Sequence, residues 1–301
     1  MKRRSLLAAL PLLGFGRAET AILTMDLHGA AASVDAQEVT AERLALVREW
    51  IGKCADAVVT YYGKFPVPAV AITLETVEGG KVSGGRTEPG DIPHIEIHLG
   101  REAGETALLH DDWVLVHEMI HLAFPWMNMQ HNWMAEGIAV YVESIARVQA
   151  GHLPASQIWG DFVKAMPKGL AKDGDGGLDE TASWGMTYWG GCMFCLMADI
   201  RIRQETDNRF SLQQALRGIN AVRDFRKEWE FRETLEIGDR AMGRHVLISL
   251  YDAMKDKLVK PDLDQMWKEL GIVKSESGIA FDDSAPLASI RKGVTGGQRQ
   301  A

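Results

Sequence analysis

The sequence predicts an α+β fold in which a small lobe with a mixed sheet precedes a mainly helical lobe. The first hundred residues contain short runs of alternating apolar and polar residues, which are typical of strands. From Asp111 onward, apolar residues recur mostly at helical spacing. The 301 residues are 46% hydrophobic and 25% charged, which is the composition of a globular protein with a sizeable core.

Residues 1–18 have the layout of a secretory signal peptide. Basic residues at 2–4 precede an apolar stretch over 6–15, and small residues follow at the end of the segment. The apolar stretch is too short to span a bilayer comfortably, and no later stretch is longer and equally apolar. We therefore predict export to the periplasm or secretion, with an uncleaved anchor as the alternative, and no transmembrane domain beyond this segment.

The first lobe, residues 19–105, is expected to hold a sheet and one long helix. Apolar residues at helical spacing predict the helix, which Pro66 ends. In the last strand, isoleucine and leucine alternate with His94, Glu96 and His98. The expected elements are a strand over 21–27, a helix over 41–62, and strands over 69–74 and 93–99.

The second lobe, residues 106–301, is expected to be helical, with glycine-rich or proline-bearing loops between its helices. A cleft between two lobes is a common place for a ligand site. The expected helices lie over about 112–124, 133–150, 187–205, 211–218, 240–257 and 262–270.

The strongest motif is H-E-x-x-H, formed by His117, Glu118 and His121 in an otherwise uncharged stretch. Residues four apart share a helical face, so the two histidines can present their imidazole nitrogens to one metal ion. Glu118 lies about 100° further round the helix, where its carboxylate can act as general base without being a ligand. Asp111 or Asp112 can cap this helix. The alternative is a helix whose histidines bind no metal.

The next predicted helix supplies a third candidate ligand. A catalytic zinc (Zn²⁺) site usually takes three protein ligands and leaves a fourth position open. Glu136 lies early on a helix that must fold back against the first, and Gly137 lets the two helices approach closely. His131, in the connecting loop, is the rival third ligand.

The segment from Trp133 to Glu143, W-M-A-E-G-I-A-x-Y-x-E, resembles the corresponding segment of gluzincin zinc metallopeptidases, the class that includes the membrane alanyl and glycyl aminopeptidases. The resemblance implies a zincin-type, thermolysin-like catalytic domain. It also implies that Glu136 is the third zinc ligand and that Glu143, two turns further on, supports the ligands from behind.

A third segment is similar to the tyrosine-bearing helix of the same class. Tyr188 is the second residue of T-Y-W-G-G, which an apolar helix follows, and the continuation through Ser211 is most similar to the glycyl aminopeptidase branch. The resemblance implies that the Tyr188 hydroxyl donates to the oxyanion formed during hydrolysis. Donors directed at developing charge are often the largest catalytic contribution.

The resemblance covers roughly residues 90 to 290, and the chain departs from the family in three respects. Only 14 residues separate His121 from Glu136, which is shorter than the usual spacing of the aminopeptidases. Gly190 stands where the family usually has a lysine. The exopeptidase motif G-x-M-E-N is absent from the sequence, so recognition of a free substrate amine is not expected.

Two other groups of residues are weaker candidates for a functional role. A metal can bind to His94, Glu96 and His98. The preferred interpretation is that these residues form the polar face of an edge strand. In gluzincins a strand beside the site pairs with extended substrate. The backbone of this strand is therefore a better candidate for binding a peptide than its side chains are for binding a metal. His245 is a reserve candidate for transition-state stabilisation, with ordinary packing preferred.

The acidic loop over 173–179 resembles a calcium loop only faintly, and a flexible loop is expected. Three cysteines are too few for a disulfide framework. Cys192 and Cys195 are spaced like a redox pair but lie in an apolar helical run, so buried thiols are expected, with a second metal or redox site as the alternative.

The charge balance disfavours nucleic acid as a partner. The first 18 residues hold four basic groups and no acidic one, so the remainder carries 29 basic and 41 acidic side chains. We therefore expect an exported zinc metallopeptidase (a hydrolase) with a peptide or protein substrate. The alternatives are a noncatalytic zinc-binding or peptide-binding protein of the same fold, and a zinc hydrolase that acts on a non-peptide bond. The oligomeric state is not indicated.

Overall fold

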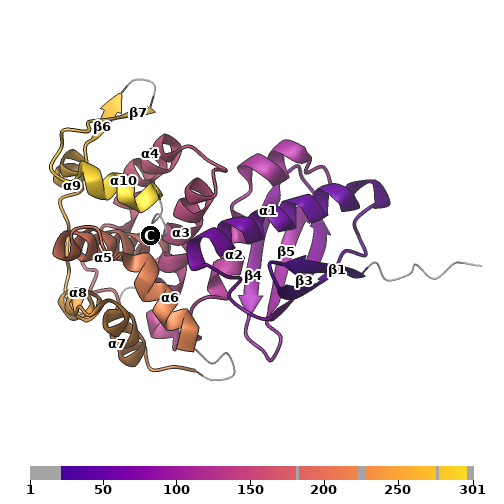
Figure 1. Ribbon diagram of the computed structural model, residues 1–301, viewed down its shortest axis with the longest axis horizontal. Helices are drawn as coiled ribbons and strands as arrows, with labels where there is room; N and C mark the ends of the chain where they lie inside the picture. Colours follow the sequence, from indigo (N-terminus) through magenta and orange to yellow (C-terminus); the bar gives the residue numbers. More distant parts are fainter. Residues whose placement is uncertain (1–21, 181–182, 223–227, 276–277, 297–301) are drawn as a thin grey trace, which may run out of the picture.

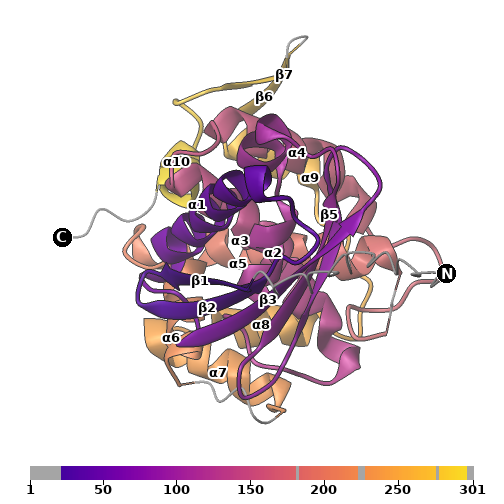
Figure 2. The same cartoon turned by 90° about the vertical axis from the view of Figure 1, so that its right-hand side faces the viewer.

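A five-stranded sheet with the long helix α1 (Leu44–Tyr62) packed along it forms the first lobe (Figures 1 and 2). The computed structural model describes residues 22–180, 183–222, 228–275 and 278–296. The predicted signal peptide lies outside the described residues, so export stays a prediction. The strands that it describes are β1 (Ile22–Leu27), β2 (Ala30–Asp35), β3 (Ala69–Val77), β4 (Val82–Glu88) and β5 (His94–Gly100).

The spatial order of the strands is β1-β2-β3-β5-β4. The pairs β2–β3 and β3–β5 are parallel, whereas the outer pairs β1–β2 and β4–β5 are antiparallel. Strand β5 therefore has a neighbour on both sides, and the prediction that it is an edge strand was wrong. The edge beside the helical lobe is β4, whose sequence V-S-G-G-R-T-E lacks the apolar alternation of a strand.

The alternation predicted for β5 is present in the structure. Ile95, Ile97 and Leu99 are fully buried in the core. His94 and Glu96 occupy the opposite, partly exposed face of the sheet, together with the remaining polar residue of the strand. The apolar face of β5 therefore lines the core on the side of the sheet that the helices cover, and its polar face lies on the other side.

Two helices lie between the sheet and the rest of the helical lobe (Figure 1): α2 (Val114–His121) and α3 (Asn132–Gln149). Helix α2 is short and buried along nearly its whole length. Asp112 caps it, because one carboxylate oxygen accepts the Val114 N–H at 3.0 Å and the other accepts the Leu115 N–H at 3.4 Å. The second oxygen also accepts the indole N–H of Trp50 at 2.8 Å, which ties α2 to α1.

Helix α3 also packs closely against α5 (Gly191–Thr206). A Cβ at Gly137 would lie 2.3 Å from the backbone of Gly191, so neither helix tolerates a side chain at this crossing. The sequence predicted that Gly137 brings α3 close to α2, and this was wrong, because the glycine faces α5.

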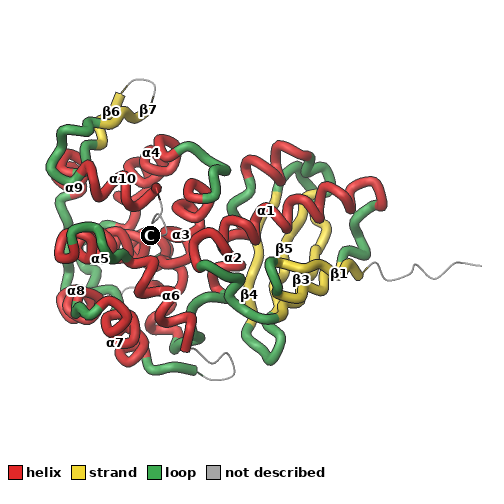
Figure 3. The backbone as a smooth tube through the Cα atoms, in the orientation of Figure 1, coloured by secondary structure: helices red, strands yellow, loops and turns green. Residues whose placement is uncertain are grey.

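The remaining helices complete the second lobe, which Figure 3 shows as mostly helical. The predicted helix over 240–257 is two helices: Gly243, with φ of 64°, ends the first, and Asp239 accepts the Leu247 and Ile248 N–H groups at the start of the second. A small hairpin, β6–β7, projects away from the body (Figure 2). The elements are α4 (Ala155–Ala165), α6 (Leu212–Val222), α7 (Phe231–Met242), α8 (Val246–Met254), α9 (Leu263–Glu269), β6 (Ile272–Ser275), β7 (Gly278–Phe281) and α10 (Ala288–Gly296).

The two lobes share one hydrophobic core of buried side chains. Cys54, Cys192 and Cys195 are free and buried in it, as expected for structural thiols. Across the described part of the chain, no helix combines the length and the apolar composition that crossing a membrane requires.

Candidate active site

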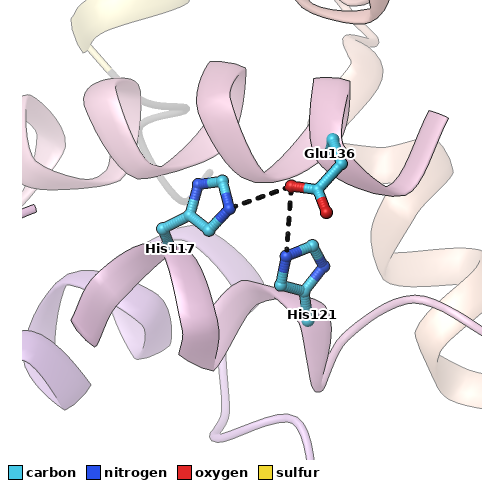
Figure 4. Close-up of side chains that lie close together, drawn as sticks. All are labelled: His117, His121 and Glu136. Atoms are coloured by element: carbon cyan, nitrogen blue, oxygen red, sulfur yellow. Dashed lines mark hydrogen bonds and ion pairs between the residues drawn. The ribbon is translucent and has the colours of Figure 1, made fainter. Parts of the chain in front are cut away.

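Helices α2 and α3 bring three potential metal ligands together (Figure 4). His117 and His121 project from one face of α2 toward Glu136 on α3. Both Nε2 atoms approach the same oxygen, Oε2 of Glu136, at 3.2 Å from His117 and 3.6 Å from His121. One ligand atom from each of the three residues lies within 4.8 Å of the other two.

The donor set fits a zinc ion. Two imidazole nitrogens and one carboxylate oxygen are ligands that zinc accepts, and three protein donors leave a position open for water or substrate. His117 is buried, and its other ring nitrogen, Nδ1, has no hydrogen-bond partner among the described residues. The Nε2 atom is thus the nitrogen of His117 that faces the shared centre.

The charges of the cluster are mutually stabilised. Burial opposes ionisation of Glu136, but hydrogen bonds from His117 and His121 hold its pKa well below the ordinary value. Burial favours the neutral form of His121, yet the neighbouring Glu136 and Glu118 raise its pKa overall. A carboxylate that stays ionised between two imidazoles is ready to serve as a ligand.

Glu118 projects from α2 toward the edge strand β4. It is buried, and its Oε2 accepts a hydrogen bond from the Thr87 hydroxyl at 2.8 Å. The same hydroxyl lies 2.9 Å from the backbone carbonyl oxygen of Glu118. A Cβ at Gly85 would lie 3.0 Å from Cγ of Glu118, so β4 passes directly over this side chain. Thr87 was not predicted from the sequence, because the polar, glycine-rich β4 does not have the apolar alternation of a strand.

Tyr188 lies in a single π-helical turn, Met186–Gly190, that leads into α5. Its ring is nearly parallel to that of His117, with 6.4 Å between the ring centroids. Partial burial, together with Glu136 and Glu118, raises the pKa of Tyr188, so the hydroxyl keeps its proton at neutral pH. Tyr188 lines the same cavity as Glu118 and the three potential ligands.

Glu143 lies deeper on α3 and has other partners. Its carboxylate accepts hydrogen bonds from Ser144 at 2.7 Å and from Arg147 at 3.3 Å. Burial raises the pKa of Glu143 to about 7. Because both partners lie on α3 itself, support of the ligands by Glu143 stays a prediction.

His131, the rival third ligand, is engaged elsewhere. Its Nδ1 lies 3.1 Å from a carboxylate oxygen of Asp179, and its ring stacks on Phe231 with 4.2 Å between centroids. Asp179 also accepts hydrogen bonds from Trp133 at 2.9 Å and from Tyr251 at 2.7 Å. The structure therefore places Glu136, not His131, with the two histidines. Asp179 lies in the loop over 173–179, which was expected to be flexible. It holds His131, one of the residues that line the cavity at the site.

The weaker candidates lie outside the cavity. His98 Nε2 lies 3.4 Å from Glu75 and 3.5 Å from Glu96, but these side chains are partly exposed and Arg86 already pairs with Glu96 at 3.1 Å. Ion pairing on the polar face of the sheet accounts for this cluster. His245 is exposed at the start of α8, away from the residues that line the cavity.

Comparisons with protein-family models and with curated proteins give no match. Among solved structures, the chain is similar to an aminopeptidase N family protein from Idiomarina loihiensis, with a TM-score of 0.55 and 13% identity over 83% of this chain and 49% of that one. It is also similar to an M1 zinc metallopeptidase from Deinococcus radiodurans, with a TM-score of 0.51 and 12% identity over 80% of this chain and 52% of that one.

The chain thus spans about half the length of the solved structures that it resembles. At this low identity the similarity shows the fold alone: a mixed α+β structure like part of these M1 metallopeptidases. The expectation of an α+β fold is confirmed at this level.

Proposed function

We propose that this protein is a zinc-dependent metallopeptidase of the gluzincin type that hydrolyses peptide bonds. The observation that carries the proposal is the convergence of His117, His121 and Glu136 on one point, with Glu118 on the same helix as the two histidines. A site that only stabilised the fold would close its fourth position and would need no base beside it. The likeness to M1 zinc metallopeptidases supports the proposal at the level of the fold.

His117, His121 and Glu136 would hold the zinc ion. Bound zinc supplies Lewis acidity, which polarises a carbonyl group and lowers the pKa of water from about 15.7 to about 7. Glu118 takes a proton from the attacking water and passes it to the leaving amine. The C–N bond breaks, the acyl carbon gains the hydroxyl, and the amine gains the proton.

Two further side chains complete the chemistry. The Thr87 hydroxyl holds the carboxylate of Glu118 in one orientation through the 2.8 Å hydrogen bond. Tyr188 donates its hydroxyl proton as a hydrogen bond to the oxyanion that develops on the substrate carbonyl. Partial burial of this tyrosine among the site residues supports a fixed donor rather than a mobile surface group.

We also propose that the reaction takes place outside the cytoplasm, on peptides or unfolded proteins. Export rests on residues 1–18, which have the layout of a signal peptide. Sequencing the N-terminus of the protein recovered from the periplasm or the medium tests it, since cleavage near residue 18 is expected. Recovery only from the cytoplasm, with the N-terminus intact, would contradict export.

The experiment that tests the function compares the wild type with Glu118→Gln and His117→Ala. Zinc content is measured by atomic spectroscopy, and cleavage of a mixed peptide library is followed with and without a chelator. We expect Glu118→Gln to keep zinc and lose turnover, because it removes the base and leaves the ligands. His117→Ala should lose both.

The two rival functions predict different results in the same assay. Zinc present in the wild type without cleavage of any peptide would favour the noncatalytic alternative. Zinc-dependent cleavage of small esters or epoxides, without peptide cleavage, would favour a non-peptide hydrolase. Unchanged peptidase activity in Glu118→Gln would remove this residue from the mechanism.

A further inference from the structure

The site lies between two cavities rather than at the end of one, and we propose that the protein cleaves internal bonds of extended polypeptides. In this arrangement, which rests on the proposed peptidase function, the chain on one side of the cleaved bond lies along β4. The chain on the other side places a large apolar side chain in a second cavity, lined by tryptophan.

The first cavity, of about 340 Å³, lies on the β4 side of the potential ligands. Its walls come from β4, from the loop after α2 and from α3. Trp126 and Met129 are exposed at its rim. Strand β4 is the last strand of the sheet, so its outer edge can pair with an extended peptide.

The second cavity, of about 580 Å³, is lined by residues that precede α2, by α3 beyond Glu136, by α4 and by the segment around Tyr188. Trp113, one of its walls, packs edge-on against His117 with 5.7 Å between ring centroids. Trp184, another wall, stacks on Tyr188 at 5.6 Å. Tyr188 itself lines both cavities. The second cavity therefore starts where the first ends, at the proposed oxyanion donor.

The lining of the second cavity suits a large apolar or aromatic side chain. Trp113 and Trp184 are 49% and 60% exposed, and Trp189 adds a third indole to the walls. Such exposed rings in a cavity are characteristic of a binding surface. Acidic and basic side chains both line this cavity, so it has no strong preference for one sign of charge: Asp111, Glu143, Asp161, Arg147, Lys164 and Lys168.

The first cavity offers no uncommitted carboxylate for a substrate amine among the described residues. Glu118 accepts the hydrogen bond from Thr87, and Glu136 faces the two histidines. Glu88 pairs with Arg86 at 3.5 Å and is about half exposed. An aminopeptidase needs a group that holds the free N-terminus. The absence of such a group agrees with a chain that continues past the site.

The test uses the zinc-loaded full chain and two peptides of one sequence with a central phenylalanine. One peptide has free termini, and the other is acetylated and amidated. Mass spectrometry should find both cut at the same internal bond at similar rates. Stepwise loss of N-terminal residues from the free peptide alone would overturn the inference and leave the proposed function standing. Cleavage of neither peptide would overturn the inference, and the proposed function falls with it only if the mixed peptide library is also left uncut.

A set of variants tests the second cavity. Trp184→Ala should lower kcat/KM for the phenylalanine peptide about tenfold, through a higher KM, and should affect an alanine peptide much less. Trp184→Phe, which keeps a ring in the wall, should restore most of the loss. Ile22→Ala removes an apolar side chain of similar exposure, 56%, from the opposite edge of the sheet, and should change nothing. Equal losses for both peptides, or no loss, would overturn the assignment of this cavity.

Discussion

Thr87 lies 2.8 Å from the carboxylate of Glu118, and this hydrogen bond orients the proposed general base. It joins the edge strand β4, where substrate is expected to pair, to the helix that carries Glu118 and the two histidines. Groups that orient a catalytic side chain matter for turnover although they touch no reacting atom.

Replacing Thr87 tests its role in orienting Glu118. Thr87→Val keeps the shape and removes the hydroxyl, so we expect kcat to fall by about 10- to 100-fold with little change in KM or zinc content. Thr87→Ser keeps the hydroxyl and should stay close to the wild type. Steady-state kinetics on one peptide, with zinc analysis of each variant, would measure this. Equal kcat values for the valine and serine variants would contradict the role.

Glu143 gives the protein a pH-dependent stability. Its pKa of about 7 lies above the ordinary value of 4.5, so the folded state binds this proton more tightly than the unfolded state. The stabilising contribution is complete below pH 4.5 and is lost as the pH rises through 7. The difference amounts to about 3 kcal/mol.

Glu143→Gln isolates this contribution, because glutamine has the same shape and does not titrate. Urea unfolding at several pH values should show nearly equal stabilities near pH 4 and a more stable variant near pH 8, by at most about 3 kcal/mol. Parallel stability curves for the two proteins over this range would show that Glu143 does not titrate as described.

At the residue scale, local spacing identified the groups that the structure brings together. His117 and His121 are four residues apart on one helix, and Glu136 follows early on the next. The partners of these groups were not predictable in the same way. Thr87 and Asp179 reach the site from segments far away in the sequence, and no local pattern encodes such contacts.

At the scale of elements, helices α3 and α5 cross at close range. The crossing places Gly137, the neighbour of Glu136, against the backbone of Gly191. The position of Glu136 therefore depends on the crossing of α3 and α5, where there is no room for a side chain.

Gly137→Ala tests this crossing, with Gly52→Ala as its control. A Cβ at Gly137 would lie 2.3 Å from backbone, so α3 and α5 must move apart, and we expect a loss of about 1–3 kcal/mol or more. A Cβ at Gly52, within α1, meets nothing within 4 Å. Alanine there should stabilise the helix by about 0.5–1 kcal/mol. Urea unfolding measures both, and a neutral Gly137→Ala would contradict the packing described.

Elements with a strong period were predictable, and those without one were not. The helix α1 and the strands β3 and β5 follow their apolar patterns. Strand β4 is rich in glycine and polar residues because it lies at an edge, where one side of its backbone pairs and little of it is buried. The break between α7 and α8 was not predicted, because the apolar pattern continues on both sides of Gly243, which has a left-handed conformation.

At the scale of the whole molecule, the candidate metal site lies where strand β4 of the first lobe meets helices α2 and α3 of the second. A ligand that binds only the folded state stabilises it in proportion to the logarithm of its concentration over the dissociation constant. Zinc should therefore stabilise the folded protein by joining α2 to α3, as well as support catalysis.

Removal of zinc tests this coupling. A chelator should lower the Tm of the wild type by roughly 5–10 °C, and added zinc should restore it. Glu118→Gln should show the same shift, because its ligands remain, whereas His121→Ala should show almost none. Differential scanning calorimetry would measure all three proteins. An identical Tm with and without the chelator would contradict zinc binding at this site.

The most direct test of the account is a crystal structure of the zinc-loaded protein with anomalous diffraction at the zinc edge. We expect one strong anomalous peak in contact with Nε2 of His117, Nε2 of His121 and a carboxylate oxygen of Glu136. A peak elsewhere, or a Glu136 side chain turned away from an ion that the histidines bind, would contradict the proposed centre.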